Sequence, residues 1–310
     1  MCHIWNVDSG SQPETTMEEK KRFIKSLKDL VAPGFEFHLS GGEPLLTEGI
    51  FELIKFISDE GYNTNLVTNG FLINSKVAQK LIASGLGSVT FSLDGASAKT
   101  HDFLRGVEGS YEKVMQAIGF LDSLRGKTKI AILTTIMEKN LDELLELAEW
   151  VQHDKRLEMI SFQAVTQPFS EDADPGWFAK EKNKLLWPQD IKKTAFIMER
   201  LRELKNSGYK VGNQPNHFLH FKGYFQDPNT FLKKIKCNLG DYEFHVDPYG
   251  KVFFCCLMDP IGNIKSGTLP EIWNSPGTEK IRRDVYACKK NCHIMINCFY
   301  EDESVLKGAK

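Results

Sequence analysis

The sequence predicts an α/β protein, in which a partial (β/α)6 TIM-like barrel is followed by a small cysteine-rich α+β module. Two observations predict this fold class. Residues 16 to about 165 alternate between helical and strand patterns, and six of the seven cysteines lie in the last quarter of the 310-residue chain. Strands separated by single helices form parallel βαβ units, and the functional residues of such units gather at the carboxyl ends of the strands.

The elements of the barrel follow from apolar spacing. A capping box at Thr16-Met-Glu-Glu19 starts the first helix. Short apolar runs predict strands at 35–39, 63–68, 88–93, 129–136 and 158–165, and helical spacing predicts helices between them at 48–60, 75–84, 111–124 and 141–153. Because a helix precedes the first of these strands, we expect one further strand before residue 1.

The alternation stops after Pro168. A helix is expected at 190–207, and an aromatic-rich helix at 217–231. A cysteine-bearing module begins at Cys237. We therefore expect three parts: the barrel core at 1–170, a helical connection at 171–236 and the cysteine module at 237–310.

Composition excludes several classes of protein. The chain has 39 Lys and Arg against 41 Asp and Glu, a net charge of −2, and the two signs are mixed along the sequence. This gives no electrostatic footprint for nucleic acid, and no apolar run is long enough to span a membrane. Met1 to Gln12 lacks the features of a signal peptide. We expect a cytoplasmic protein, in which clustered cysteines indicate metal binding rather than disulfides.

Glycine-containing motifs follow three successive predicted strands: Ser40-Gly-Gly-Glu-Pro44, Val67-Thr-Asn-Gly70 and Ser92-Leu-Asp-Gly95, with Arg105 ten residues beyond the last. Glycine allows the backbone to approach a ligand closely. Each motif alone would be only a turn. The set, together with Cys2 lying 39 residues before Gly41, resembles the radical S-adenosylmethionine (SAM) superfamily over nearly the whole chain.

The resemblance implies a catalytic cluster motif at the start of the barrel. The superfamily opens with Cys-x3-Cys-x2-Cys just after the first strand, followed by an aromatic residue. Cys2 and Trp5 look like the third cysteine of that motif and its trailing aromatic. The other two cysteines would lie upstream, so we expect the chain to be truncated within the motif and to lack two ligands of the catalytic [4Fe–4S] cluster.

The resemblance also implies a SAM site at the strand ends. Gly41, Gly42, Glu43 and Pro44 would receive the SAM amino group, and Ser92 and Asp94 would lie near the ribose and sulfonium. Arg105 would pair with the SAM carboxylate, and Gln163, with Phe162 and Val165 beside it, would lie near the adenine. The alternatives are a turn hydroxyl for Ser92 and a surface salt bridge for Arg105. Thr68 and Asn69 are expected to form a turn, and Gln163, Gln167 and Asn213 are candidate substrate contacts.

The C-terminal cysteines form two groups. Cys237 and Cys255 flank a predicted hairpin that turns at Asp247-Pro-Tyr-Gly250, and the second group, Cys288-x3-Cys292-x5-Cys298, follows a predicted helix at 270–283. The pattern resembles the SPASM and twitch extensions of radical SAM enzymes. It implies one auxiliary [4Fe–4S] cluster with ligands drawn from Cys237, Cys255, Cys288, Cys292 and Cys298. Cys256 points to the opposite strand face from Cys255. Zinc is the alternative metal, although no tight Cys-x2-Cys knuckle is present.

The function implied by the resemblance is reductive cleavage of SAM to a 5′-deoxyadenosyl radical that abstracts hydrogen from a peptide or small-molecule substrate. The electron would come from a donor such as flavodoxin or ferredoxin. The alternative is a truncated, non-catalytic iron–sulfur or zinc protein that binds a partner.

Overall fold

The computed structural model describes residues 13–28, 30–31, 34–124, 126–168, 174–232, 237, 239–288 and 293–297. Within these ranges the chain packs into two compact units. Unit 1 contains the described residues from Gly34 to Asp227. Unit 2 contains those from Pro13 to Val31 and from Pro228 onward. The part boundaries expected at 170 and 236 remain a prediction.

Unit 1 is built on a parallel sheet with the strand order β1-β2-β3-β4-β5. Its strands are β1 (Glu36–Leu39), β2 (Asn63–Thr68), β3 (Ser88–Ser92), β4 (Lys129–Ile136) and β5 (Met159–Ala164). Sequential parallel order confirms the α/β class and the partial barrel, since each neighbouring pair is joined by a crossover helix.

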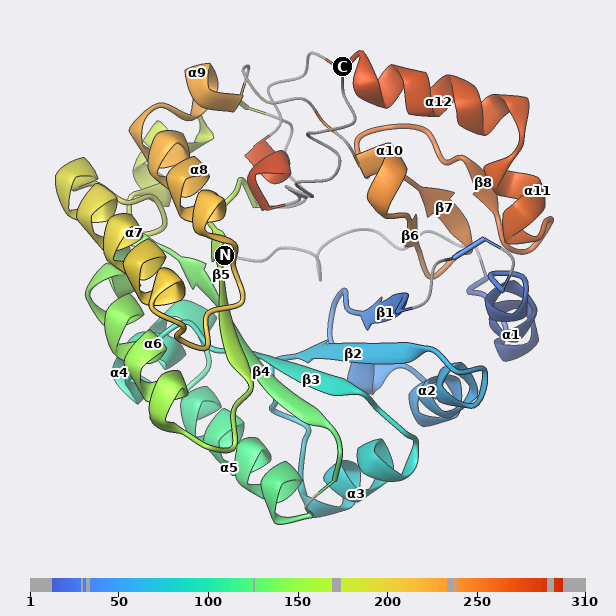
Figure 1. The fold of residues 1–310 in the computed structure, drawn as a ribbon, viewed down its shortest axis with the longest axis horizontal. Coiled ribbons are helices and arrows are strands. Elements are labelled where there is room, and N and C mark those ends of the chain that lie inside the picture. The colour runs from blue at the N-terminus through green and yellow to red at the C-terminus, as the bar shows by residue number, and fades with distance from the viewer. Residues whose placement is uncertain are drawn as a thin grey trace. The chain divides into compact units, whose positions relative to one another are not determined.

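Helices cover one side of this sheet (Figure 1). The crossover elements are η2 (Pro44–Leu46), α2 (Ile50–Asp59), α3 (Ser75–Ala83), α4 (Ala98–Arg105), α5 (Ser110–Ser123), η3 (Glu138–Glu143) and α6 (Leu144–His153). On β2 to β5 the side chains of this face are buried and lie in register across the sheet, as in the row Thr68, Phe91, Ile132 and Ile160. This face is the core of unit 1.

The opposite face of the sheet is polar and partly exposed. Near the carboxyl edge, Ser92, Leu133 and Ser161 form one row, and Thr135 and Gln163 form the next. Strand alternation explains the difference, since neighbouring residues point to opposite faces. The polar face is therefore the side from which a ligand can reach the strand ends.

The remaining elements of unit 1 follow β5. They are η4 (Trp177–Ala179), η5 (Glu181–Asn183), α7 (Ile191–Asn206) and α8 (Pro215–Gln226). Between the last two helices, Val211 forms an isolated parallel bridge with Ile160 of β5. The aromatic stretch expected as one helix ends at Gln226, because a proline at 228 starts the short helix α9 (Pro228–Leu232).

Unit 2 contains an antiparallel sheet of β6 (His245–Val246), β7 (Lys251–Phe253) and β8 (Gly262–Asn263). Asp247 closes the β6–β7 hairpin, since its Oδ1 accepts from the main-chain N–H groups of Tyr249 and Lys251, and Gly250 takes a φ of +87°. This confirms the predicted hairpin. The other elements are α9, α10 (Leu239–Tyr242), α11 (Leu269–Trp273), α12 (Pro276–Tyr286) and η6 (His293–Asn297).

The first helix of the chain, α1 (Met17–Lys25), packs within unit 2. Its Arg22 donates to the carbonyl of Ile264 at 3.0 Å, and Ser26, just beyond its end, accepts from the N–H of Leu269 at 3.0 Å. These contacts join positions more than 240 residues apart in the sequence. The capping box at Thr16 and Glu19 is formed as predicted.

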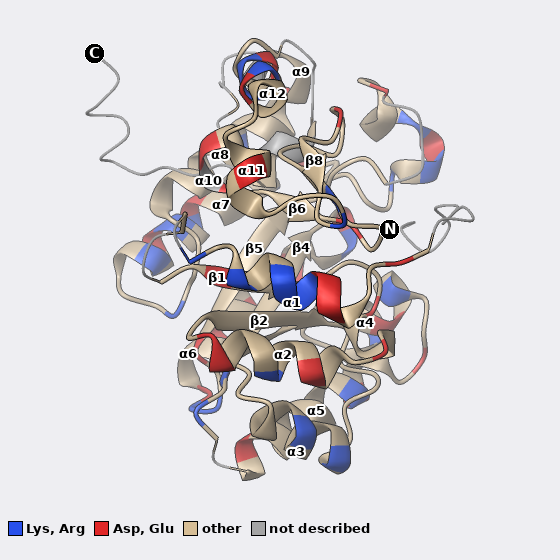
Figure 2. Ribbon diagram, turned by 90° about the vertical axis from the view of Figure 1, so that its right-hand side faces the viewer, with Lys and Arg blue, Asp and Glu red and all other residues tan. Residues whose placement is uncertain are grey.

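Figure 2 shows charged residues of both signs on the same helix in α1 and in α2; in α1 the acidic residues lie in the first turn and basic residues follow them. No helix in the described part of the chain is both long and apolar enough to cross a membrane.

Candidate active site

The loop after β1 leaves open space beside its glycines. Gly41 and Gly42 are exposed, and a Cβ atom added to either would meet no other atom of the described residues within 4 Å. Gly41 has a φ of +127°, a conformation that L-residues rarely adopt. The backbone here can therefore be approached closely by a ligand, as the sequence predicted.

Glu43 from the same loop is used within the protein. Its carboxylate accepts a hydrogen bond from the Thr68 hydroxyl at 2.8 Å and from the N–H of Asn69 at 3.0 Å, and it caps η2 through Leu45 N–H at 3.2 Å. Pro44 is buried at the first position of that 3-10 helix. Glu43 thus joins the end of β1 to the end of β2, and the loop presents main-chain groups to a ligand.

The turn after β2 is held by its own side chains. Asn69 Oδ1 accepts from the N–H of Phe71 at 2.9 Å, and the Thr68 hydroxyl accepts from the N–H of Gly70 at 3.1 Å. This confirms the prediction that Thr68 and Asn69 form a turn.

Asp94, two residues beyond β3, lies at the centre of a buried network. Its side chain is fully buried, Oδ1 accepts from the N–H of Thr135 on β4 at 2.8 Å, and Oδ2 lies 2.7 Å from Nη2 of Arg105. Asn140 donates to its main-chain carbonyl at 2.8 Å. The Asp94 carboxylate thus holds Arg105, and its expected place near SAM stays a prediction.

The short helix α4 carries the partners of Asp94. His101 and Arg105 lie one turn apart on α4, and His101 Nδ1 accepts from the main-chain N–H of Asp94 at 3.0 Å. Gly95 is required here because a Cβ atom at this position would lie 2.7 Å from the main-chain nitrogen of His101. Neither α4 nor His101 was found from the sequence. The only signal was the spacing of four between two basic residues, since α4 has no apolar stripe.

Burial dominates the electrostatics of this network. Burial raises the pKa of Asp94, while the Arg105 guanidinium and the Thr135 N–H oppose that rise. Burial, with the charge of Arg105 as a second cause, lowers the pKa of His101 to about 4. At neutral pH His101 is therefore an uncharged acceptor. Arg105 remains 22% exposed, and its Nε is buried without an acceptor among the described residues.

Glu143 was also missed by the sequence reasoning. From the end of η3 it accepts from the N–H groups of Ala96 and Ser97 at 2.6 and 3.3 Å and from the Thr100 hydroxyl. It therefore fixes the start of α4 from the side of β4. Glu143 lies 46 to 47 residues after Ser97 and Ala96 in the chain, so no local sequence pattern indicates this contact.

The polar face contributes Ser92 and Gln163. Gln163 donates to the Thr135 hydroxyl at 3.0 Å, and the Ser92 hydroxyl makes no hydrogen bond within the described part of the chain. Phe162 lies on the buried face against Phe218, so this expected neighbour of the adenine faces away from Gln163. Val165 is buried as well.

The other two candidate substrate contacts have internal partners. The side-chain amide of Asn213 accepts from the N–H of Phe162 at 2.7 Å and donates to its carbonyl at 2.8 Å. Asn213 thus provides hydrogen-bond partners for main-chain groups at the edge of β5. Gln167 accepts from the N–H of Asp174 at 2.9 Å. Of the three candidates, Gln163 alone stands on the partly exposed face of the sheet.

In unit 2 the described cysteines, Cys237, Cys255, Cys256 and Cys288, make no disulfides. Cys255 is partly buried, and its sulfur accepts from the N–H of Leu257 at 3.4 Å, whereas Cys256 is exposed. An N–H donor to a cysteine sulfur suits an iron–sulfur ligand. The described residues alone bring no three metal-binding side chains together. Cys2, Cys292 and Cys298 lie outside the described residues, so the ligand sets of both clusters remain predictions.

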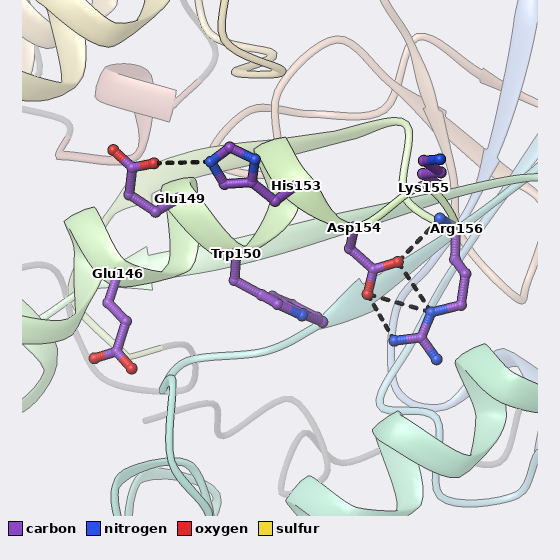
Figure 3. A pocket seen from close by; sticks show the side chains of 7 residues that line it. All are labelled: Glu146, Glu149, Trp150, His153, Asp154, Lys155 and Arg156. Carbon is purple, nitrogen blue, oxygen red and sulfur yellow. Dashed lines mark hydrogen bonds and ion pairs between the residues drawn. The ribbon is translucent and has the colours of Figure 1, made fainter.

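A surface hollow lies elsewhere on unit 1. Figure 3 shows Trp150, His153, Asp154 and Arg156 around it, at the end of α6 and the segment leading into β5. These residues precede β5, so the hollow is at the amino end of the strands, opposite the motifs described above. Asp154 and Arg156 form an ion pair there, in which the aspartate side chain is largely buried and the arginine is partly exposed.

Comparison with known proteins identifies two domain families. The model of the radical SAM superfamily matches residues 1–151, and that of an iron–sulfur cluster-binding domain, SPASM, matches residues 237–298. Two AdoMet-dependent heme synthases are similar in sequence. That of Nitratidesulfovibrio vulgaris is 33% identical over 281 residues, covering 88% of this chain and 74% of the relative. That of Methanosarcina barkeri is 28% identical over 303 residues, covering 94% and 83%.

Among solved structures, native anSMEcpe with bound AdoMet superposes with a TM-score of 0.62 at 19% identity, covering 91% of this chain and 79% of that one. The same protein has been solved with AdoMet and the Cp18Cys peptide. The similarity supports the fold of the partial barrel.

Proposed function

This chain belongs to the radical SAM superfamily, and we propose that the carboxyl edge of its β1–β5 sheet binds SAM. The observation that carries the proposal is the open space at Gly41 and Gly42. Ser92 at the end of β3 offers a hydroxyl, and Arg105 at the end of α4 offers a partly exposed guanidinium.

The residues of this edge suit the groups of SAM. Exposed main-chain groups beside Gly41 and Gly42 accept hydrogen bonds from an ammonium group, and the Arg105 guanidinium pairs with a carboxylate. Asp94 and Glu143 fix α4, so the guanidinium is held before the ligand arrives. With a reduced [4Fe–4S] cluster, bound SAM supplies a 5′-deoxyadenosyl radical that takes a hydrogen atom from the substrate. The polar face with Gln163 and Ser92 would orient the ligands.

We propose a tetrapyrrole as the first substrate class, because the two heme synthases are similar over most of both chains. A peptide is the second class, supported by a structural neighbour solved with one. A flavodoxin or ferredoxin would supply the electron. A titration with heme, followed by its Soret absorption and repeated with SAM present, tests the first class. A saturable shift that depends on SAM supports it, and a spectrum that does not change excludes it.

Equilibrium binding of SAM under anaerobic conditions tests the site. In Gly42→Val the new side chain would occupy open space, so the fold should persist while SAM affinity falls by at least about tenfold, or 1.4 kcal/mol. Gly119→Val is the matched control, because a Cβ added to Gly119 on α5 would also meet no atom within 4 Å, and this residue is remote from the strand ends. Equal SAM affinity in the two variants would contradict the proposal.

A further inference from the structure

Arg282 on α12 lies at the meeting point of three cysteine-bearing segments of unit 2. Its guanidinium carbon is 4.8 Å from the ring centre of Trp273 and 5.2 Å from that of Phe254. The two rings meet edge to face with their centres 5.4 Å apart. The side chain of Arg282 is 16% exposed, although most arginines in proteins are solvated.

Two contacts of Arg282 lead to segments that carry candidate cluster ligands. Phe254 is fully buried and directly precedes Cys255. The Nε of Arg282 donates to the carbonyl of Gly240 at 3.3 Å, in the short helix α10 that begins two residues after Cys237.

The third segment is α12 itself. It ends at Tyr286, and the N–H of Cys288 donates to the carbonyl of Val285 at 3.2 Å, so the helix end fixes the cysteine backbone. The hydroxyl of Tyr286 also binds Asp241 of α10, a second tie between the segments of Cys237 and Cys288.

The contacts also explain why an arginine is present. A guanidinium is planar, so it can stack on aromatic rings while its fixed fork of N–H groups donates in the plane, whereas the ammonium group of lysine is a compact point charge. Arg282 pairs with Glu279 through Nη1 at 2.8 Å. Its Nη2 is buried and has no acceptor among the described residues. A buried donor without a partner is costly, so a partner that completes the domain is expected.

We propose that Arg282 is a positioning residue for the auxiliary iron–sulfur cluster. It holds the segments that carry Cys237, Cys255 and Cys288 together, and its unpaired Nη2 and positive charge act on the bound cluster. The proposal rests on the proposed function and on the auxiliary cluster expected from the match of residues 237–298 to the iron–sulfur cluster-binding domain. Arg282 stacks on two aromatic rings, donates a hydrogen bond to the main chain and carries a charge. Together these contacts would keep the cysteines close to one another before iron binds.

The test compares Arg282→Met and Arg282→Lys with the wild-type chain after anaerobic reconstitution. Arg283→Met is the matched control, since Arg283 is the next residue on α12 and its side chain is 68% exposed. We expect Arg282→Met to lose iron to a chelator at least severalfold faster than wild type, and Arg282→Lys to be intermediate. In Arg282→Met the midpoint potential of the cluster that remains should shift to more negative values, because this variant has lost the positive charge.

Thermal unfolding of the apo proteins separates cluster positioning from general folding. An Arg282→Lys variant with the apo stability of Arg283→Met, but with faster iron loss, supports the proposal. The proposal would be overturned if both Arg282 variants had the same iron content, rate of iron loss and midpoint potential as Arg283→Met. If the wild-type chain itself binds no iron and sulfide, the cluster of the proposed function fails, and the inference fails with it.

Discussion

The carboxylate of Asp94 holds the guanidinium of Arg105, with Oδ2 and Nη2 2.7 Å apart and the aspartate side chain fully buried. Removal of one partner from a buried ion pair leaves an uncompensated charge. We expect Asp94→Asn to lower the free energy of unfolding by about 2–4 kcal/mol, measured with urea. Asp59→Asn is the control, since both side chains of the Lys55–Asp59 pair are exposed and its loss should cost at most about 1 kcal/mol. Equal losses in the two variants would show that burial does not strengthen the first pair.

The same pair should control how the protein discriminates between SAM and methylthioadenosine, which has no carboxylate. If Arg105 binds the SAM carboxylate, Asp94→Asn should reduce SAM affinity by about tenfold and leave methylthioadenosine affinity nearly unchanged. Calorimetric titration of both ligands measures this difference. A parallel loss of both affinities would mean that Asp94 only maintains the fold.

Stability should depend on pH through His101. Its pKa falls from 6.5 to about 4 on folding, so the folded protein binds this proton more weakly than the unfolded chain does. The stability contribution is complete above pH 6.5 and is lost as the pH falls toward 4, with a total of about 3 kcal/mol. Urea unfolding of wild type and His101→Gln between these pH values measures it. The difference between the two proteins should shrink with falling pH, whereas the exposed control His153→Gln should follow wild type. A constant difference would refute this assignment.

Glu43 should contribute to both stability and ligand binding. Glu43→Ala removes acceptors from the Thr68 hydroxyl and the Asn69 N–H, so we expect a loss of about 1–3 kcal/mol in the free energy of unfolding. SAM affinity should also fall, because the glycine loop loses its attachment to β2. The exposed Glu48 provides the control variant Glu48→Ala. The prediction fails if SAM affinity is the same in both variants.

The metal content of the purified chain should show one cluster. Six of the seven cysteines lie from position 237 onward, and a [4Fe–4S] cluster takes about four of them. We expect about four irons and four sulfides per chain after reconstitution. Cys255→Ser should lose them, and the exposed Cys256→Ser should retain them. Bound zinc without sulfide would contradict the assignment.

The sequence predicted the sheet well because local patterns determine it. Strands β2 and β4 have the predicted limits, 63–68 and 129–136, since β-branched and apolar residues alternate there between clear turn signals. The helix expected at 270–283 is two helices, α11 and α12, because Ser275 and Pro276 begin a new one.

The parts that escaped prediction depend on long-range contacts. The packing of α1 within unit 2 depends on Arg22 and Ser26 meeting residues near 264 and 269, which no local pattern encodes. The sequence motif placed Asp94 near SAM, which stays a prediction, but it did not indicate that the carboxylate is buried between β4 and α4. A sequence motif identifies such a residue, but the hydrogen-bond partners that decide its role come from elsewhere in the chain.

The central claim is that SAM binds at the carboxyl edge of the β1–β5 sheet. A crystal structure of the chain with SAM tests it most directly. We predict ligand density against the backbone of Gly41 and Gly42, with the carboxylate at Arg105 and the adenosine toward Gln163. The claim would be contradicted if the carboxyl edge were empty and the ligand density lay at the amino end of the strands, for example in the hollow beside Trp150.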